Sequence, residues 1–173
     1  MNSKILEAIK SMSNNNFDKA YSLLKEAYIN NPKNPNLNFY LANLCLRYNE
    51  FKNGLKHIII SLKNNPDNED YNNIAGILLY KLGIYSLSKK FFEKTLDLVP
   101  NHEGAFTSLK AIEDLGYIED SDIDNDIEEV IKEFNKMFID FRYSKLPTLS
   151  VCIIAKNEEK TYRKSNKECK KHS

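Results

Sequence analysis

The sequence is poor in the features that mark several large classes of protein. Among 173 residues there are only five glycines, five prolines and three cysteines, and the net charge is +1. No apolar run reaches the roughly 20 residues that span a bilayer, and the first nine residues include Lys4 and Glu7 rather than the apolar core of a signal peptide. A balanced charge gives no reason to expect nucleic acid or an acidic membrane surface as a partner. We therefore expect a cytoplasmic chain that binds neither.

The cysteines and histidines form no recognisable chemical site. Cys45, Cys152 and Cys169 are odd in number and unrelated in spacing, which predicts free thiols in a reducing compartment. The three histidines are far apart in the sequence, with no cysteine or carboxylate at metal-ligand spacing. Cys45 lies on the apolar side of a predicted helix and is expected in the core. We expect no metal, no cofactor and no catalytic residue.

What the sequence does have is a period of 34 residues. Pro32, Pro66 and Pro100 are 34 apart, and aromatic residues keep the same step at positions 17, 51 and 85. Small residues keep it in three further columns: Ala8, Ala42 and Gly76; Ala20, Gly54 and Ser88; Ala27, Ser61 and Thr95. Proline cannot continue a helix, and small residues let two helices approach closely. The pattern predicts helical pairs in tandem, three pairs being about the minimum for a stable stack.

This pattern resembles the tetratricopeptide repeat, a two-helix unit that stacks into a superhelix. The resemblance implies an all-α solenoid with three repeats over residues 1–102 and a capping helix over residues 103–116. The six repeat helices are predicted at residues 3–13, 18–30, 36–48, 52–64, 69–82 and 86–98, and the capping helix at 102–115. Lys110 stands where the repeats have a small residue. Such a departure is what a terminal unit should show.

Residues 117–145 are predicted to form an acidic loop and an amphipathic helix. Ten acidic residues and one lysine occur between Glu113 and Glu133. A calcium loop of the EF-hand type needs glycine at its sixth position and glutamate at its twelfth, and counting from Asp120 these positions hold Asn125 and Ile131. Acidic residues also favour the first turn of a helix, which is the better interpretation. We expect that helix at residues 123–141, with an apolar stripe that must cover another surface.

The resemblance also implies a concave groove that binds peptides and is lined by the first helix of each repeat. Leu46 and Ile77 would face this groove, together with five residues expected to contact a ligand: Asn43, Arg47, Asn73, Tyr80 and Lys81. Arg47 and Lys81 could meet a carboxylate, and Asn43 a peptide backbone. The alternative is that all are ordinary solvated residues. The basic-and-asparagine set of the family's chaperone-tail binders is not reproduced.

Residues 146–160 differ in kind from the repeats. Residues 149–154 are a short apolar run typical of a buried parallel strand, and Ala-Lys-Asn-Glu-Glu follows at 155–159. This resembles the first strand and nucleotide-site loop of family 2 glycosyltransferases, which implies a strand-like remnant in which Asn157 and Glu158 belong to a nucleotide site. No Asp-x-Asp follows Glu159, and one strand cannot form a parallel sheet. We therefore expect no transferase activity.

Residues 161–173 are polar, rich in lysine and without apolar periodicity, which predicts a disordered tail. Read one base later, one permitted set of codons for residues 162–172 spells a peptide with apolar residues at i, i+3, i+4 and i+7, one face of a helix. This indicates a frameshift that truncates a longer glycosyltransferase. The excess of lysine over arginine, 22 to 3, is typical of AT-rich bacterial genomes.

Three functions are consistent with these patterns. The chain is a non-catalytic protein-interaction module, the amino-terminal part of a bacterial repeat–glycosyltransferase fusion. Alternatively, it is a subunit that docks acceptors for a separate glycosyltransferase, or a free-standing peptide-binding scaffold. Recovery of a transferase or of unrelated peptides from a lysate would distinguish the last two.

Overall fold

The computed structural model describes residues 3–116 and 119–144, with side chains up to Phe138. These residues form eight α-helices and no strand, which confirms the predicted all-α fold. The chain divides into two compact units, residues 1–134 and 135–173. The predicted strand and loop at 146–160, with Asn157 and Glu158, and the predicted tail at 161–173 lie outside the described residues.

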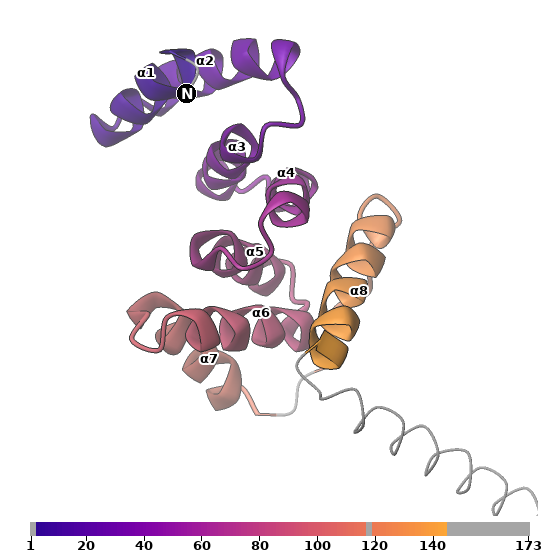
Figure 1. Cartoon of the computed structure of the whole chain (residues 1–173). Coiled ribbons are helices and arrows are strands. Elements are labelled where there is room, and N and C mark those ends of the chain that lie inside the picture. Colours follow the sequence, from indigo (N-terminus) through magenta and orange to yellow (C-terminus); the bar gives the residue numbers. More distant parts are fainter. Residues whose placement is uncertain (1–2, 117–118, 145–173) are drawn as a thin grey trace, which may run out of the picture. The chain divides into compact units, whose positions relative to one another are not determined.

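Helices α1 to α6 form three antiparallel pairs that follow one another along the array, and α7 packs after the third pair (Figure 1). Their bounds are α1 Ser3–Ser13, α2 Phe17–Asn30, α3 Pro35–Arg47, α4 Phe51–Asn64, α5 Glu69–Lys81, α6 Tyr85–Leu98 and α7 Glu103–Asp114. Each helix packs against the next one along the chain, and α3 also contacts α5. Helices α3 and α5 begin 34 residues apart, as do α4 and α6. The 34-residue period of the sequence is therefore the period of the structure.

Capping residues explain where the helices begin. Asn34 precedes α3, and its side chain accepts a hydrogen bond from the Leu37 backbone N–H at 2.9 Å. Asn68 does the same for α5 with Tyr71, also at 2.9 Å. Such a side-chain oxygen satisfies one of the donors that the first turn of a helix leaves without a partner.

The turns inside the pairs also follow the period. Asn15, Asn49 and Gly83 are 34 apart, and their φ angles are 58°, 59° and 75°. Asparagine and glycine tolerate this left-handed conformation better than other residues. The same column therefore reverses the chain in each of the three repeats.

The small-residue columns lie where helices cross. All of their members from Ala8 to Thr95 are buried. A Cβ atom added to Gly54 would lie 2.6 Å from Leu78 Cδ2, and one added to Gly76 would lie 2.7 Å from the Phe92 ring. At these two crossings the neighbouring helix occupies the space of a side chain, which is why glycine stands there.

Helix α7 ends the described array. Ala105 and Ile112 pack with Phe92 of α6 in one apolar cluster. Lys110 is exposed on α7, at the position that Ala42 and Gly76 hold in α3 and α5. A long charged side chain prevents another helix from crossing there at short distance. The role of α7 as a cap stays a prediction.

The predicted start of the last helix is wrong by five residues. Helix α8 spans Glu128–Ser144, whereas the acidic pattern had placed its start at residue 123. The Asp124 side chain accepts a hydrogen bond from the Asp126 backbone N–H at 2.9 Å, and its carbonyl accepts one from Ile127 at 3.0 Å. Aspartate side chains compete in this way with helical hydrogen bonds, so residues 124–127 form a turn instead.

Residues 119–134, which comprise the acidic segment before α8 and the first seven residues of α8, pack along α4 and α6, and we call them the acidic strap. Ile127, Ile131 and Phe134 are buried, and the Phe134 ring meets the Phe91 ring of α6 edge-on at 5.0 Å. Glu133 pairs with Lys63 of α4 at 2.8 Å. The predicted apolar stripe therefore covers the second helices of the second and third repeats. None of the helices in residues 3–116 and 119–144 is long and apolar enough to cross a membrane.

Candidate functional site

The five predicted ligand contacts all lie on first helices of repeats. Asn43 and Arg47 are on α3, and Asn73, Tyr80 and Lys81 are on α5. The two asparagines and Tyr80 are half-buried, and the two basic residues are exposed. We call this set the first-helix face. Because α3 and α5 contact each other, the structure places the five residues on two neighbouring helices.

Two of these side chains have partners within the chain that the sequence did not reveal. The Arg47 guanidinium lies 3.7 Å from the centre of the Phe17 ring, a cation–π contact with α2. Asn43 donates from Nδ2 to the Phe39 carbonyl of its own helix at 3.0 Å. Arg47 is thus held at one end of α3 with its charge still exposed to solvent. The bond to Phe39 uses the Nδ2 group of Asn43, and the side-chain oxygen of Asn43 can accept a hydrogen bond from a ligand.

The α5 half of the first-helix face combines a buried polar atom with aromatic contacts. Asn73 Oδ1 is buried and has no hydrogen-bond partner among the described residues. Close to Asn73 in sequence, the Tyr71 ring packs on Phe39 of α3 at 5.1 Å, and its hydroxyl donates to Asn36 Oδ1 at 2.9 Å. Tyr80 packs edge-on against Tyr85 at 5.5 Å.

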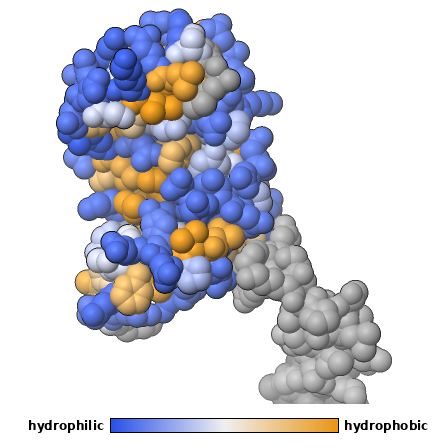
Figure 2. Space-filling view, turned by 60° about the vertical axis from the view of Figure 1, so that its left-hand side comes forward, coloured by the Kyte–Doolittle hydropathy of each residue, from blue (hydrophilic) through white to orange (hydrophobic). Residues whose placement is uncertain are grey.

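The surface on the side of the array that lies to the left in Figure 1 is mixed. Figure 2 shows apolar patches separated by hydrophilic side chains rather than one continuous apolar stripe. Leu6 of α1 and Phe106 of α7 are among the exposed large apolar residues of the described part of the chain. A mixed surface of this kind suits a ligand that offers both polar and apolar groups.

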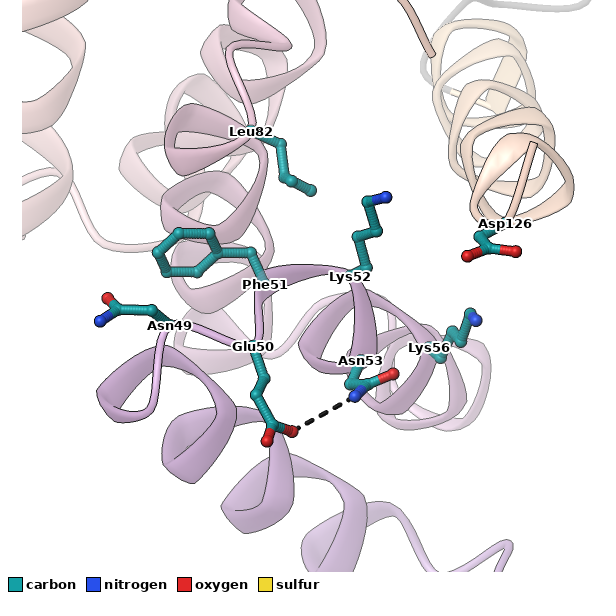
Figure 3. Close-up of a pocket in the computed structure, with 8 residues that line it drawn as sticks. All are labelled: Asn49, Glu50, Phe51, Lys52, Asn53, Lys56, Leu82 and Asp126. Atoms are coloured by element: carbon teal, nitrogen blue, oxygen red, sulfur yellow. Dashed lines mark hydrogen bonds between the residues drawn. The ribbon is translucent and has the colours of Figure 1, made fainter. Parts of the chain in front are cut away.

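A cavity of about 410 Å³ lies at the turn between α3 and α4 (Figure 3). Its lining residues are Asn49, Glu50, Phe51, Lys52, Asn53, Lys56, Leu82 and Asp126. The Lys52 ammonium also pairs with Asp124 of the acidic strap. Hydrogen bonding within that pair raises the pKa of Lys52 and lowers the pKa of Asp124. Of the two lysines that line this cavity, Lys52 is therefore paired with a carboxylate of the same chain, and the charge of Lys56 also helps to lower the pKa of Asp124.

A second cavity, of about 150 Å³, lies between α2, α3 and α4, and we call it the α2–α4 pocket. It is lined by Tyr21, Lys25, Tyr28, Leu41, Cys45, Glu50, Asn53 and His57. Burial raises the pKa of the Cys45 thiol to about 11, so the thiol is protonated at neutral pH. Cys45 is buried and in the core, as its place on the apolar side of the helix predicted. It is a poor nucleophile, because only the thiolate reacts.

His57 of this pocket takes part in a partly buried hydrogen bond that sequence reasoning missed. Its Nδ1 lies 2.8 Å from Asn38 Oδ1. Both amide hydrogens of Asn38 are already donated, to the Pro32 and Asn34 carbonyls, so the oxygen accepts and His57 Nδ1 carries the hydrogen. Burial lowers the pKa of His57. The recurrence of asparagine at 34 and 38, then at 68 and 72, was the available signal.

The described residues contain no group of three or more histidine, cysteine or carboxylate side chains placed to hold a metal ion.

Comparison with known proteins identifies the repeats. The family model described as tetratricopeptide repeat matches residues 11–78, which include α2 to α4 and most of α5. No curated protein matches the chain at a significant level.

Solved structures of low sequence identity share the fold. The first tetratricopeptide domain of Spaghetti (RPAP3), bound to the HSP90 peptide SRMEEVD, is 20% identical with a TM-score of 0.61 and covers 65% of this chain and 89% of its own. The second such domain of human RPAP3, in complex with an HSP70 peptide, is 18% identical with a TM-score of 0.58, covering 64% and 92%. The Sgt2 domain from Aspergillus fumigatus is 15% identical with a TM-score of 0.58, covering 70% and 87%.

The helical pairs, their 34-residue period and the family match agree with one another. Residues 11–78 match the tetratricopeptide repeat model, and helices α1 to α6 have the arrangement of such repeats.

Proposed function

We propose that the chain is a non-catalytic protein-interaction module that binds an acidic peptide on its first-helix face. The observation that carries the proposal is the placement of Arg47 and Lys81, both exposed, at the same position of two neighbouring first helices, 34 residues apart. Two cations at this spacing favour a ligand with carboxylates. Asn43 lies on α3 with Arg47, and Asn73 lies on α5 with Lys81; both offer amide groups to a peptide backbone.

Two further facts support this choice of ligand. The peptide SRMEEVD in the RPAP3 complex is acidic at its carboxyl end. The fixed position of Arg47 over the Phe17 ring also lowers the entropy that a long side chain loses on binding. Lys81, at the end of α5, is the freer of the two.

The test is fluorescence anisotropy of the full chain with labelled SRMEEVD. We expect saturable binding that weakens as salt rises, because exposed charges are screened. Lys81→Ala should weaken binding several-fold, which corresponds to about 1 kcal/mol. Lys33→Ala is the matched control, since Lys33 is exposed in the turn between α2 and α3. Equal affinities for the three proteins, or no saturation, would exclude the first-helix face as the site.

The finer proposal is that these repeats serve a family 2 glycosyltransferase, either as part of the same protein or as an acceptor-docking subunit. It is supported by the apolar run at 149–154 and the Asn-Glu-Glu sequence at 157–159, which lie outside the described residues. Sequencing the DNA after codon 160 tests the first form: an open shifted frame with an Asp-x-Asp sequence supports it, and an early stop codon contradicts it. Recovery of a transferase with the purified chain tests the second form.

A further inference from the structure

The acidic strap shows that the second helices of two neighbouring repeats can bind a further segment, which here is a turn followed by the start of a helix. Lys52 is the second residue of α4 and Lys63 the last but one, and they pair with Asp124 and Glu133 respectively. The strap therefore follows the length of α4, and Phe134 packs on Phe91 of α6. Repeat arrays offer the same kind of surface once per repeat, so the equivalent surface on α2 and α4 can be compared directly.

The α2–α4 pocket is the counterpart of the surface that the strap covers. Adding 34 to each lining residue of the pocket gives eight buried apolar residues of α4 to α6, among them Ile59, Leu87 and Phe91. In the pocket the corresponding three residues are Lys25, Asn53 and His57. The floor is apolar in both places, but the rim of the pocket carries hydrogen-bonding groups.

The two lysines of α4 that pair with the strap have different residues at the equivalent positions of α2. Ile29 corresponds to Lys63, which pairs with Glu133. Ile29 is 80% exposed, the most exposed of the large apolar residues in the described part of the chain. Asp18 corresponds to Lys52, which pairs with Asp124. A helix that lay on α2 and α4 as the strap lies on α4 and α6 would meet an apolar side chain and a carboxylate where the strap meets two lysines.

We propose that the surface of α2 and α4 around the α2–α4 pocket binds an amphipathic helix of another protein. The side chains of the partner helix follow from Asp18, Ile29 and the pocket. The helix carries a basic residue near its start, opposite Asp18, and an apolar residue opposite Ile29. Next to the apolar residue it carries an aromatic side chain that enters the pocket, as Phe134 packs on Phe91. Charge complementarity at Asp18 and the exposed Ile29 select this partner over a helix with the charges of the strap.

A redesigned strap peptide is the direct probe. The probe is residues 119–134 with Asp124→Lys and Glu133→Leu, labelled and titrated with the full chain. The redesign supplies the two required groups, and its new lysine repels Lys52 at the strap's own site. We expect saturable binding, with an affinity at least about tenfold higher than that of the native peptide. The substitution Phe134→Ala in the probe should lower this affinity at least about tenfold.

A charge exchange on the protein decides where the probe binds. Ile29→Lys should weaken the redesigned peptide about tenfold and strengthen a peptide that keeps Glu133 and carries Asp124→Lys. Leu6→Lys is the matched control, an apolar-to-lysine change at an exposed position of α1, and it should change neither affinity. Unchanged circular dichroism shows that both variants fold. Lys81→Ala should have no effect, so this proposal and the proposed function fail separately.

Three results would overturn the proposal. One is the absence of saturable binding of the redesigned peptide at millimolar concentration. Another is equal binding by the wild type and Ile29→Lys. The third is self-association of the chain in sedimentation experiments that Ile29→Lys abolishes, because the occupant would then be a second copy.

Discussion

At the residue scale, one asparagine column links the repeats. Asn72 donates from Nδ2 to the Pro66 carbonyl at 2.8 Å and to the Asn68 carbonyl at 2.7 Å. Asn38 makes the same two bonds one repeat earlier. This amide joins the proline turn to the first helix and explains why an almost fully buried polar side chain is tolerated there.

The two asparagines differ in what their oxygens meet. Asn38 Oδ1 accepts from His57, whereas Asn72 Oδ1 has no partner among the described residues. The residue 34 positions after His57 is Phe91, which cannot donate a hydrogen bond but packs on Phe134. The third repeat thus has the Phe91–Phe134 contact with the acidic strap at the position where the second repeat has the His57–Asn38 hydrogen bond.

We predict that His57→Phe lowers the free energy of unfolding by about 1–3 kcal/mol, because it leaves Asn38 Oδ1 buried without a donor. Urea unfolding at pH 7.5 measures this. Leu6→Phe, at an exposed position of α1, serves as the control and should be nearly neutral. An unchanged midpoint for His57→Phe would show that the buried bond contributes nothing.

The pH dependence of stability should also depend on His57. Its pKa is lowered in the folded chain, so the unfolded chain binds more protons at mildly acidic pH. The contribution of His57 to stability is then present above its unfolded pKa of about 6.5 and is lost as the pH falls through the folded pKa. We expect the melting temperature to fall from pH 7.5 to 5 more steeply for the wild type than for His57→Phe. Parallel curves for the two proteins would contradict this.

The Cys45 thiol gives a second prediction at this scale. Because its pKa is raised to about 11, the folded chain binds this proton more tightly than the unfolded chain does. Its contribution to stability is full below the unfolded value near 9 and is lost as the pH rises through 11. At neutral pH, mass spectrometry should find Cys45 unmodified by iodoacetamide in the folded chain and modified in urea. Fast modification without denaturant would show that the site opens easily.

At the scale of the element, close helix crossings are the sensitive points. Gly54→Leu places a side chain where Leu78 Cδ2 would be 2.6 Å from the first added carbon, and we predict a loss of about 1–3 kcal/mol through overpacking. Gly104→Ala is a mild control, because its added carbon would lie 3.4 Å from the His102 ring. Chemical denaturation compares the two. An unchanged stability of Gly54→Leu would show that α4 and α5 can move apart at no cost.

The start of α6 depends on the acidic strap. Ile84 precedes α6 and makes no capping bond with its side chain. Instead, the Ser86 backbone N–H donates to Asp120 Oδ1 at 2.8 Å, and the Ser86 hydroxyl donates to the same carboxylate. We predict that Asp120→Ala costs about 0.5–2 kcal/mol, the usual effect of removing a cap. Asp122→Ala, at an exposed position two residues later, is the control. Equal unfolding curves for the two variants would exclude this cap.

The sequence predicted the elements better than the contacts between them. Helices α1 to α6 follow from proline, aromatic and small-residue columns, because these residues act locally on backbone and packing. The start of α8 was wrong because aspartate side chains form a turn before it. The bond between Asp120 and Ser86 spans 34 residues outside the repeat pattern, and no periodicity could indicate it. Arg47 was predicted on the first-helix face, but its contact with Phe17 depends on how α2 and α3 pack.

At the scale of the molecule, the repeats and the acidic strap share one core within residues 1–134. The strap buries Ile127, Ile131 and Phe134. Phe134 of the strap packs on Phe91 of α6, which is also buried. The strap is thus part of the folded array and not an appendage to it.

We therefore predict that a chain ending at Gly116 is less stable and more prone to aggregate than a chain ending at Ser144. Removal of the strap exposes an apolar patch on α4 and α6, and such patches promote association. Thermal melts, light scattering and binding of an apolar dye compare the two truncations. Equal behaviour would show that the strap adds little to the core.

The distance along the chain between α4 and the acidic strap has a consequence for synthesis. Lys52 and Asp124 are 72 residues apart, whereas most contacts of a repeat array join neighbours and form quickly. Phe134 is 36 residues beyond Leu98, the last residue of α6. At about 5–20 residues per second, the strap leaves the ribosome about 2–7 seconds after the third repeat is complete. During that interval α4 and α6 present their bare apolar surface to the cell, and a chaperone could bind there before the chain covers it itself.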